Sequence, residues 1–139
     1  MSGIAALTRH PFMRFALIGA GGYLVDTLVL ALDTRVLDPF SGRVLSIFVA
    51  MTFTWLGNRI LTFPQHAARG SLSAIAHEWL RFTGANIVGA VINYTIYALL
   101  LSFAGGPFAD KFVAQACGVG AGLLCNFTLS KTLVFRSGL

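Results

Sequence analysis

The sequence predicts an all-α membrane protein of four transmembrane helices, arranged as two helical hairpins. Three observations predict this fold class: a low content of charged residues, four long apolar stretches and an internal repeat. Charged residues make up 11% of the 139 residues and apolar residues 56%, and the mean hydropathy is +0.77. A soluble domain carries about 25% charged residues. The chain therefore has too few charges to cover a water-facing surface, a need that a lipid bilayer removes.

Each of the four apolar stretches is long enough to cross a bilayer. They run over about 12–32, 44–63, 82–103 and 112–135. About 20 residues at 1.5 Å per residue span a hydrocarbon core of about 30 Å. Helices are expected, because an isolated strand would leave its backbone groups unpaired in lipid. A basic segment before the first stretch would also suit a signal peptide, but three more spans follow, which favours a transmembrane helix.

The basic residues predict that both chain termini lie in the cytoplasm. Seven of them fall on that side: Arg9, Arg14, Arg59, Arg69, Arg81, Lys131 and Arg136. The outer loops then carry three, which are Arg35, Arg43 and Lys111, among Asp33, Asp38 and Asp110. This bias follows the positive-inside rule. We interpret the net charge of +5 as a topology signal and an attraction to anionic lipids. A nucleic-acid partner is not expected, since no soluble basic face exists.

The four stretches form two copies of one helical hairpin within a single membrane domain, residues 1–139. The copies cover about 12–63 and about 82–136. An even number of spans gives both copies the same orientation, around a pseudo-twofold axis along the membrane normal. At an offset of 67 residues the copies match at Arg14 and Arg81, Phe15 and Phe82, Gly22 and Gly89, and Asp26 and Asn93. Their ends align as 54–63 and 126–135, with Asn58-Arg59 on Ser130-Lys131.

Residues 64–81 form the one substantial cytoplasmic loop in this topology. Pro64 stops the second helix. From Ser73 the sequence fits two alternatives, a short interfacial helix leading into the third span or an ordinary polar connector.

Four segments of the sequence resemble the GtrA-like family. They are Arg-Phe at 14–15, Gly-Tyr-Leu-Val-Asp at 22–26, Asn-Arg-x-x-Thr-Phe at 58–63 and Asn-Phe-x-Leu-Ser-Lys at 126–131. The resemblance covers about 12–136, nearly the whole chain. It implies a protein of the bacterial cytoplasmic membrane that moves or handles polyprenyl-phosphate-linked sugars during assembly of cell-surface polysaccharide, including the cell wall.

Asp26 is the first candidate functional residue, because it lies inside the predicted hydrocarbon slab. It follows Arg14 by twelve residues, hence by about 18 Å along a helix. An ionised Asp there costs about 2.5–3.5 kcal/mol, so it should face a partner or a wet cavity. Asn93 occupies the same depth in the second copy. The pair is predicted to bind sugar hydroxyls; the alternative is that Asp26 only holds the helix bundle together, protonated or hydrogen-bonded to a neighbouring helix.

A second set of candidates lies near the predicted cytoplasmic interface. Arg59 and Lys131 each come four residues before the last Phe of their copy, and Arg14 and Arg81 lie at a similar level. A ring of four cations would suit a phosphate group. Snorkelling and topology anchoring are the alternative, and the preferred one for Arg14 and Arg81. Amides and hydroxyls within a helical turn of Arg59 and Lys131 complete a polar groove: Asn58, Asn126, Thr54 and Ser130.

Other sequence signals are expected to be structural or are absent. Cys117 and Cys125 are eight residues apart on one helix, too far for a disulfide. Gly118 and Gly122 form a small-xxx-small pair that lets helices approach closely, within the bundle or in a homodimer. The sequence has no phosphate-binding loop, no metal-ligand spacing and no catalytic set. Enzyme activity, a cofactor and a metal are therefore not expected.

Three functions remain open from the sequence. The first is a facilitator that translocates a polyprenyl-phosphate-linked sugar, working as a homodimer or larger assembly among membrane lipids. The second is a membrane anchor or accessory subunit that recruits a glycosyltransferase. The third is a proton-coupled exporter resembling the small multidrug-resistance transporters, which also carry a membrane carboxylate in their first helix. Against the third stand the use of Asp instead of Glu at position 26 and the strong arginine bias.

Overall fold

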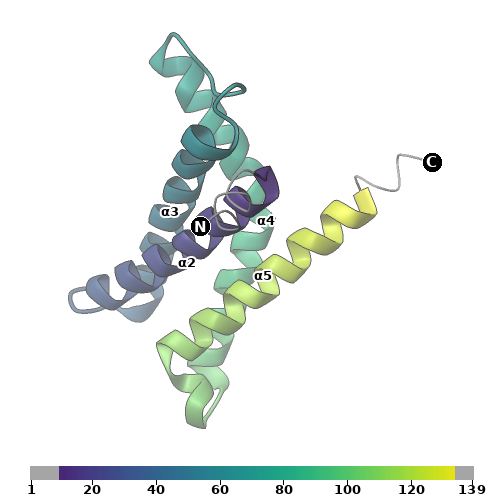
Figure 1. Ribbon diagram of the computed structural model, residues 1–139. Helices are drawn as coiled ribbons and strands as arrows, with labels where there is room; N and C mark the ends of the chain where they lie inside the picture. Colours follow the sequence, from purple (N-terminus) through teal and green to yellow (C-terminus); the bar gives the residue numbers. More distant parts are fainter. Residues whose placement is uncertain (1–9, 134–139) are drawn as a thin grey trace, which may run out of the picture. The chain divides into compact units, whose positions relative to one another are not determined.

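The computed structural model describes the backbone of residues 10–133 and the side chains of residue 10 and residues 13–125. Within these residues the fold is all-α, as predicted, with four long helices (Figure 1). They are α2 (Pro11–Asp33), α3 (Pro39–Gly57), α4 (Leu72–Phe103) and α5 (Lys111–Leu133). A π-helical turn, η1 (Asn58–Thr62), continues α3, and a 3₁₀ turn, η2 (Gly106–Ala109), precedes α5. The chain forms two compact units, the first ending at Thr83 and the second beginning at Gly84.

Three of the four predicted spans are confirmed as helices long and apolar enough to cross a bilayer. They are Met13–Asp33, Pro39–Thr62 and Leu72–Phe103. The apolar part of α5 with described side chains, Lys111–Cys125, is shorter. The fourth predicted span, over 112–135, extends beyond those side chains. The orientation in the membrane and the repeat remain predictions.

The second helix begins at Pro39 and not at position 44, where the apolar stretch starts. The carboxylate of Asp38 accepts hydrogen bonds from the backbone N–H groups of Phe40 (3.0 Å) and Ser41 (3.1 Å), which makes it the N-cap. Pro39 suits the first turn, where a backbone N–H has no helical partner. The helix therefore includes Arg43. Its predicted place in an outer loop is wrong, because hydropathy does not detect a charged residue that a helix buries.

The N-cap of α3 is expected to weaken in acid. Hydrogen bonds from Ser41, through its hydroxyl and its backbone N–H, lower the pKa of Asp38 from its ordinary value of 3.8. The carboxylate form is thus favoured by folding, so its contribution to stability is complete above the ordinary pKa and is lost as the pH falls through the lowered one. A carboxyl-carbon NMR titration of Asp38 should give this lowered pKa. A pKa at or above the ordinary value would contradict the capping role.

Helices α2 and α3 pack closely at glycines. A Cβ atom added to Gly22 would lie 2.9 Å from the methyl group of Thr54, and one added to Gly57 would lie 2.9 Å from Ile18. The side chain of Thr54 or Ile18 on the facing helix packs directly against each glycine, so a Cβ atom there would have to displace it and push the helices apart. Gly22 therefore has the packing role that glycines in a predicted span suggest.

The described side chains have a polar interior and an apolar exterior. Seven polar or charged side chains are buried: Asp26, Asp33, Arg43, Ser46, Asn58, Thr62 and Gln115. Only four apolar ones are: Ile18, Leu30, Tyr97 and Ala114. Large apolar side chains such as Leu24 and Leu28 are exposed instead. This is the reverse of the distribution in a water-soluble domain, and it suits a surface that faces lipid.

The segment after the second helix becomes helical at Leu72 and continues to Phe103 without a break. The predicted short helix from Ser73 and the third span are therefore parts of one helix. Gly70 has a φ of +100°, a conformation that glycine adopts readily. The hydroxyl of Ser71 then accepts a hydrogen bond from the backbone N–H of Ala74 (3.2 Å), which stabilises the start of α4. As a result the loop turns and brings the first turns of α4 toward the end of α3.

Candidate functional site

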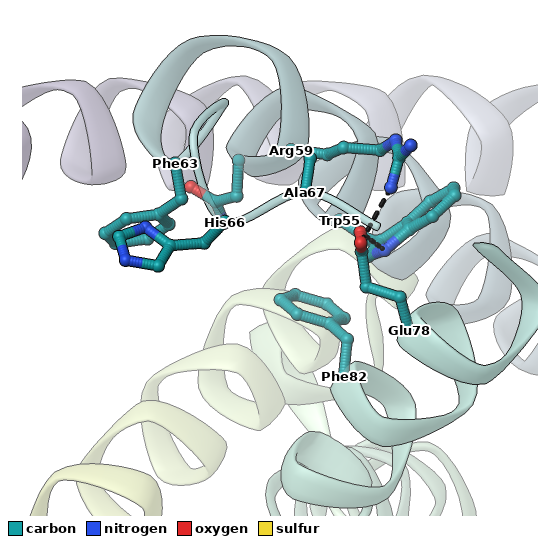
Figure 2. A pocket seen from close by; sticks show the side chains of 8 residues that line it. Trp55, Arg59, Phe63, His66, Ala67, Glu78 and Phe82 are labelled. Atoms are coloured by element: carbon teal, nitrogen blue, oxygen red, sulfur yellow. Dashed lines mark hydrogen bonds and ion pairs between the residues drawn. The ribbon is translucent and has the colours of Figure 1, made fainter. Parts of the chain in front are cut away.

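A cavity of about 230 Å³ lies in the first unit, between the end of α3, the turn η1, the following loop and the start of α4 (Figure 2). Its lining combines aromatic rings with one cation, one carboxylate and one amide. The lining residues are Trp55, Asn58, Arg59, Phe63, His66, Ala67, Glu78 and Phe82. Arg59 and Asn58, two residues predicted as phosphate and groove ligands, are thus brought together in one cavity.

The π-helical turn η1 positions Asn58 and Arg59. The backbone N–H of Phe63 donates to the carbonyl of Asn58 five residues earlier (2.8 Å), which widens the last turn of the helix. The Thr62 hydroxyl donates to the side-chain oxygen of Asn58 (3.0 Å), and both side chains are buried. Pro64 follows and cannot continue the helix. π-helical turns are rare in proteins, and those that occur often lie at functional sites.

The carboxylate of Glu78 accepts three N–H groups from around the cavity. Nη1 of Arg59 lies 2.7 Å from Oε2, and Nε1 of Trp55 lies 3.0 Å from Oε1, as Figure 2 shows by dashed lines. The backbone N–H of Ala68 also donates to Oε2. Nη2 of Arg59 donates in turn to the carbonyl of Ala68. These bonds join α3, η1, the loop and α4 at one point.

Arg14 and Thr54 make contacts within the first hairpin. Nη1 of Arg14 donates to the carbonyl of Leu61 in η1 (3.0 Å), so Arg14 lies at the same end of the hairpin as Arg59. The Thr54 hydroxyl donates to the carbonyl of Ala50 one turn earlier (2.6 Å), and its methyl group faces Gly22. Arg81, the counterpart of Arg14, is exposed. Arg14, Thr54 and Arg81 do not line the cavity.

Asp26 lies in a buried ion pair between α2 and α3. Its Oδ1 atom is 2.6 Å from Nη1 of Arg43, whose side chain is fully buried, and Arg43 also donates to the hydroxyl of Ser46 (3.0 Å). Asp26 therefore faces a partner on a neighbouring helix, one of the two arrangements expected for a carboxylate in lipid. Asn93 belongs to the second unit, where it packs against Gly118. Binding of sugar hydroxyls by Asp26 and Asn93 remains a prediction.

Three predicted ligands of the second copy lie outside the described side chains: Asn126, Ser130 and Lys131. The ring of four cations therefore also remains a prediction. Among the side chains that are described, no three His, Cys, Asp or Glu residues group as metal ligands would.

Arg43 and Glu78 were not predicted as site residues, and for Trp55 the sequence leaves two alternatives open, an interface anchor or a lining residue of the groove. For Arg43 a signal existed, because Asp38 followed by Pro39 is typical of an N-cap and first helical residue and places position 43 inside the helix. Glu78 is the only glutamate of the chain, which could have drawn attention to it. Its pairing with Arg59 depends on the path of the loop between them, which residue spacing does not give.

The apolar exterior, the polar interior and the long apolar helices define a multi-pass helical membrane protein. Comparison with family models gives a match over residues 14–135 to the family described as GtrA/DPMS, transmembrane domain. The chain belongs to this family, which confirms the resemblance seen in the sequence. No curated protein and no solved structure matched the chain.

Proposed function

We propose that this protein translocates a polyprenyl-phosphate-linked sugar across the cytoplasmic membrane, for the synthesis or modification of cell-surface polysaccharide. The family supports this function, because GtrA members are linked to translocation of such lipids. The observation that carries the proposal is the cavity of about 230 Å³ in which Arg59 and Asn58 lie beside aromatic rings. No chemical step is required, since the polar headgroup only has to change leaflet. The protein acts as a facilitator and not as an enzyme.

The lining of the cavity suits a sugar phosphate. The guanidinium group of Arg59 provides a planar set of donors for phosphate oxygens. Aromatic faces such as those of Trp55 and Phe82 offer an apolar surface to the C–H groups of a sugar ring. Outside the cavity, exposed apolar side chains leave a lipid-like surface for the polyprenyl tail. The headgroup and the tail thus each meet a matching environment.

A second candidate function is anchoring of a glycosyltransferase in the membrane. The family model is described as a transmembrane domain, which favours this alternative. A membrane anchor would need no sugar-phosphate cavity. A transferase that loses membrane association when this protein is deleted, together with no translocation by the pure protein, would support anchoring in place of transport.

The proposed function is accompanied by a topology and an assembly. We propose that both termini face the cytoplasm, that the membrane is the bacterial inner membrane and that the protein is a homodimer. Arg43, one of the three cations assigned to the outer side, lies in α3 and is ion-paired with Asp26 of α2. Seven basic residues on the proposed inner side against three on the outer side support this topology. The ion pair of Asp26 does not favour proton-coupled export, which we do not propose.

Arg59→Gln is expected to lower headgroup translocation roughly ten- to hundredfold, because a hydrogen bond to a charged group contributes about 1.5–3 kcal/mol. The assay uses liposomes with the purified protein and a polyprenyl-phosphate sugar, whose sugar is oxidised by a membrane-impermeant reagent only when it lies in the outer leaflet. Arg69→Gln is the matched control, since Arg69 is exposed in the loop that follows η1 and the variant loses the same charge. Equal loss in both variants, or no acceleration by the wild type, would contradict the proposal.

A further inference from the structure

We propose that Trp55, Arg59 and Ala68 form an oxyanion site whose intended ligand is the phosphodiester of a lipid-linked sugar, and that Glu78 occupies this site until the phosphodiester displaces it. The proposal rests on the proposed function and assigns the anion-binding groups of its cavity. Glu78 is then an internal substitute for the ligand.

The donor set is that of an oxyanion site. A guanidinium N–H, an indole N–H and a backbone N–H converge on the two oxygens of one carboxylate. The three donors come from the end of α3, from η1 and from the loop. A phosphodiester carries one negative charge on two free oxygens, as a carboxylate does, so the same three donors can bind it. Arg59 is kept in place by its second bond, to the carbonyl of Ala68.

Glu78 differs from the donors in a way that makes it displaceable. It comes from another element, α4, on a side chain with three rotatable bonds, whereas Trp55 and Arg59 lie one turn apart on a continuous helix. The side chains of Arg59 and Glu78 are only partly buried, with 17% and 24% of their surface exposed. The cavity adjoins the pair, so an incoming anion can approach Arg59 directly (Figure 2). Rotation of Glu78 then breaks the bonds to it without unfolding a helix.

The position of the cavity indicates which anion is bound. Three of its lining residues, Trp55, Phe63 and Phe82, carry large apolar rings, which a free inorganic phosphate would not contact. An anion attached to a sugar and a long apolar chain would contact both the donors and the rings. A lipid-linked headgroup therefore fits the cavity better than a free phosphate ion does.

Trp55 provides a direct reporter for this site, because the chain has only two tryptophans. In a Trp79→Phe background all tryptophan emission comes from Trp55. This background is conservative, since Trp79 packs edge-on against Phe48 and makes one long hydrogen bond, to Thr52 (3.3 Å). The detergent-solubilised protein is titrated with a short-chain polyprenyl-phosphate sugar, with the polyprenol of equal length and with inorganic phosphate. We expect a saturable change in Trp55 emission with the polyprenyl-phosphate sugar alone.

Glu78→Gln tests the displacement. The amide keeps the size of the side chain and an acceptor for Trp55 but loses the charge that competes with the ligand. If the state without Glu78 in the site is about one tenth populated, removal of the competitor lowers the Kd for the polyprenyl-phosphate sugar about tenfold. The shorter side chain of Glu78→Asp reaches the donors less well, so this variant should also lower the Kd. It replaces Glu78→Gln in the test if Glu78→Gln does not fold. Helical content by circular dichroism identifies the folded variants.

Weaker binding by both folded variants would show that Glu78 only supports the site, and would overturn the proposal. Tight binding of inorganic phosphate would overturn the assignment to a lipid headgroup. Failure of the proposed function gives a different result, namely binding with the expected Glu78 effect but no translocation in liposomes. Translocation by a wild type whose Glu78 variants bind more weakly would leave the function intact and reject the inference.

Discussion

Arg43→Gln is expected to destabilise the protein by about 3–5 kcal/mol, because it leaves the carboxylate of Asp26 buried without its partner. Arg43 is fully buried and Asp26 is 4% exposed, with 2.6 Å between Nη1 and Oδ1. Water cannot replace the lost guanidinium group at such a site. Asp26→Asn should be similarly costly, since it leaves a buried guanidinium group without its counter-ion. The free energy of unfolding can be measured by titrating mixed micelles with dodecyl sulfate while following helical content.

The double variant Asp26→Asn/Arg43→Gln provides the matched control. It removes both charges together, and well-packed neutral groups often replace a buried ion pair at little cost. The sequence itself suggests this pair of residues. At the offset of 67 Asn93 matches Asp26, and at the offset of 72 that aligns the ends of the copies Gln115 matches Arg43. Gln115 is fully buried, as Arg43 is.

We expect the double variant to lie within about 1 kcal/mol of the wild type, so that the double-mutant cycle gives a coupling of several kcal/mol. A double variant as unstable as the sum of the two single ones would contradict the role of the ion pair. Normal translocation by a stable double variant would show that the charge of Asp26 is not needed for transport and serves the hairpin alone.

The sequence was sufficient for the fold class because the bilayer imposes simple requirements. Long apolar stretches with few charges have to be helices in lipid. The last residues of α2 and α4, Asp33 and Phe103, were accordingly predicted to within one residue. The start of α3 was not predicted. It is marked by the N-cap Asp38 and by Pro39 in the first turn, and average hydropathy does not detect either signal. Arg43 was assigned to a loop for the same reason.

The candidate site was predictable only in part. Arg59 and Asn58 were expected from their place at the end of the second span, and both line the cavity. Glu78 was not predicted, because it lies 19 residues from Arg59 in the sequence and their contact depends on the turn at Gly70. Spacing arguments extend along one helix, where 3.6 residues make a turn, and do not extend through a loop. Tertiary contacts of this kind require the structure.

Gly118→Ala is expected to destabilise the second hairpin by about 1–3 kcal/mol, the usual cost of overpacking. A Cβ atom at Gly118 would lie 2.5 Å from the backbone oxygen of Asn93 and 2.7 Å from its side-chain oxygen. A backbone oxygen cannot rotate away, so α4 and α5 would have to separate. Gly122 is under the same constraint, with a Cβ atom 2.7 Å from the backbone oxygen of Gly89. The close approach predicted from the small-xxx-small pair is thus confirmed within one chain.

Gly120→Ala on the same helix separates this packing effect from the effect of alanine itself. Within the described part of the chain, no atom lies within 4 Å of a Cβ added to Gly120. Alanine favours a helix over glycine by about 0.8–1.0 kcal/mol, so this variant should be slightly more stable than the wild type. Two identical substitutions one half-turn apart should therefore change the free energy of unfolding in opposite directions. A shift of the same sign in both would contradict the close contact of Gly118 with Asn93, because only that contact distinguishes the two positions.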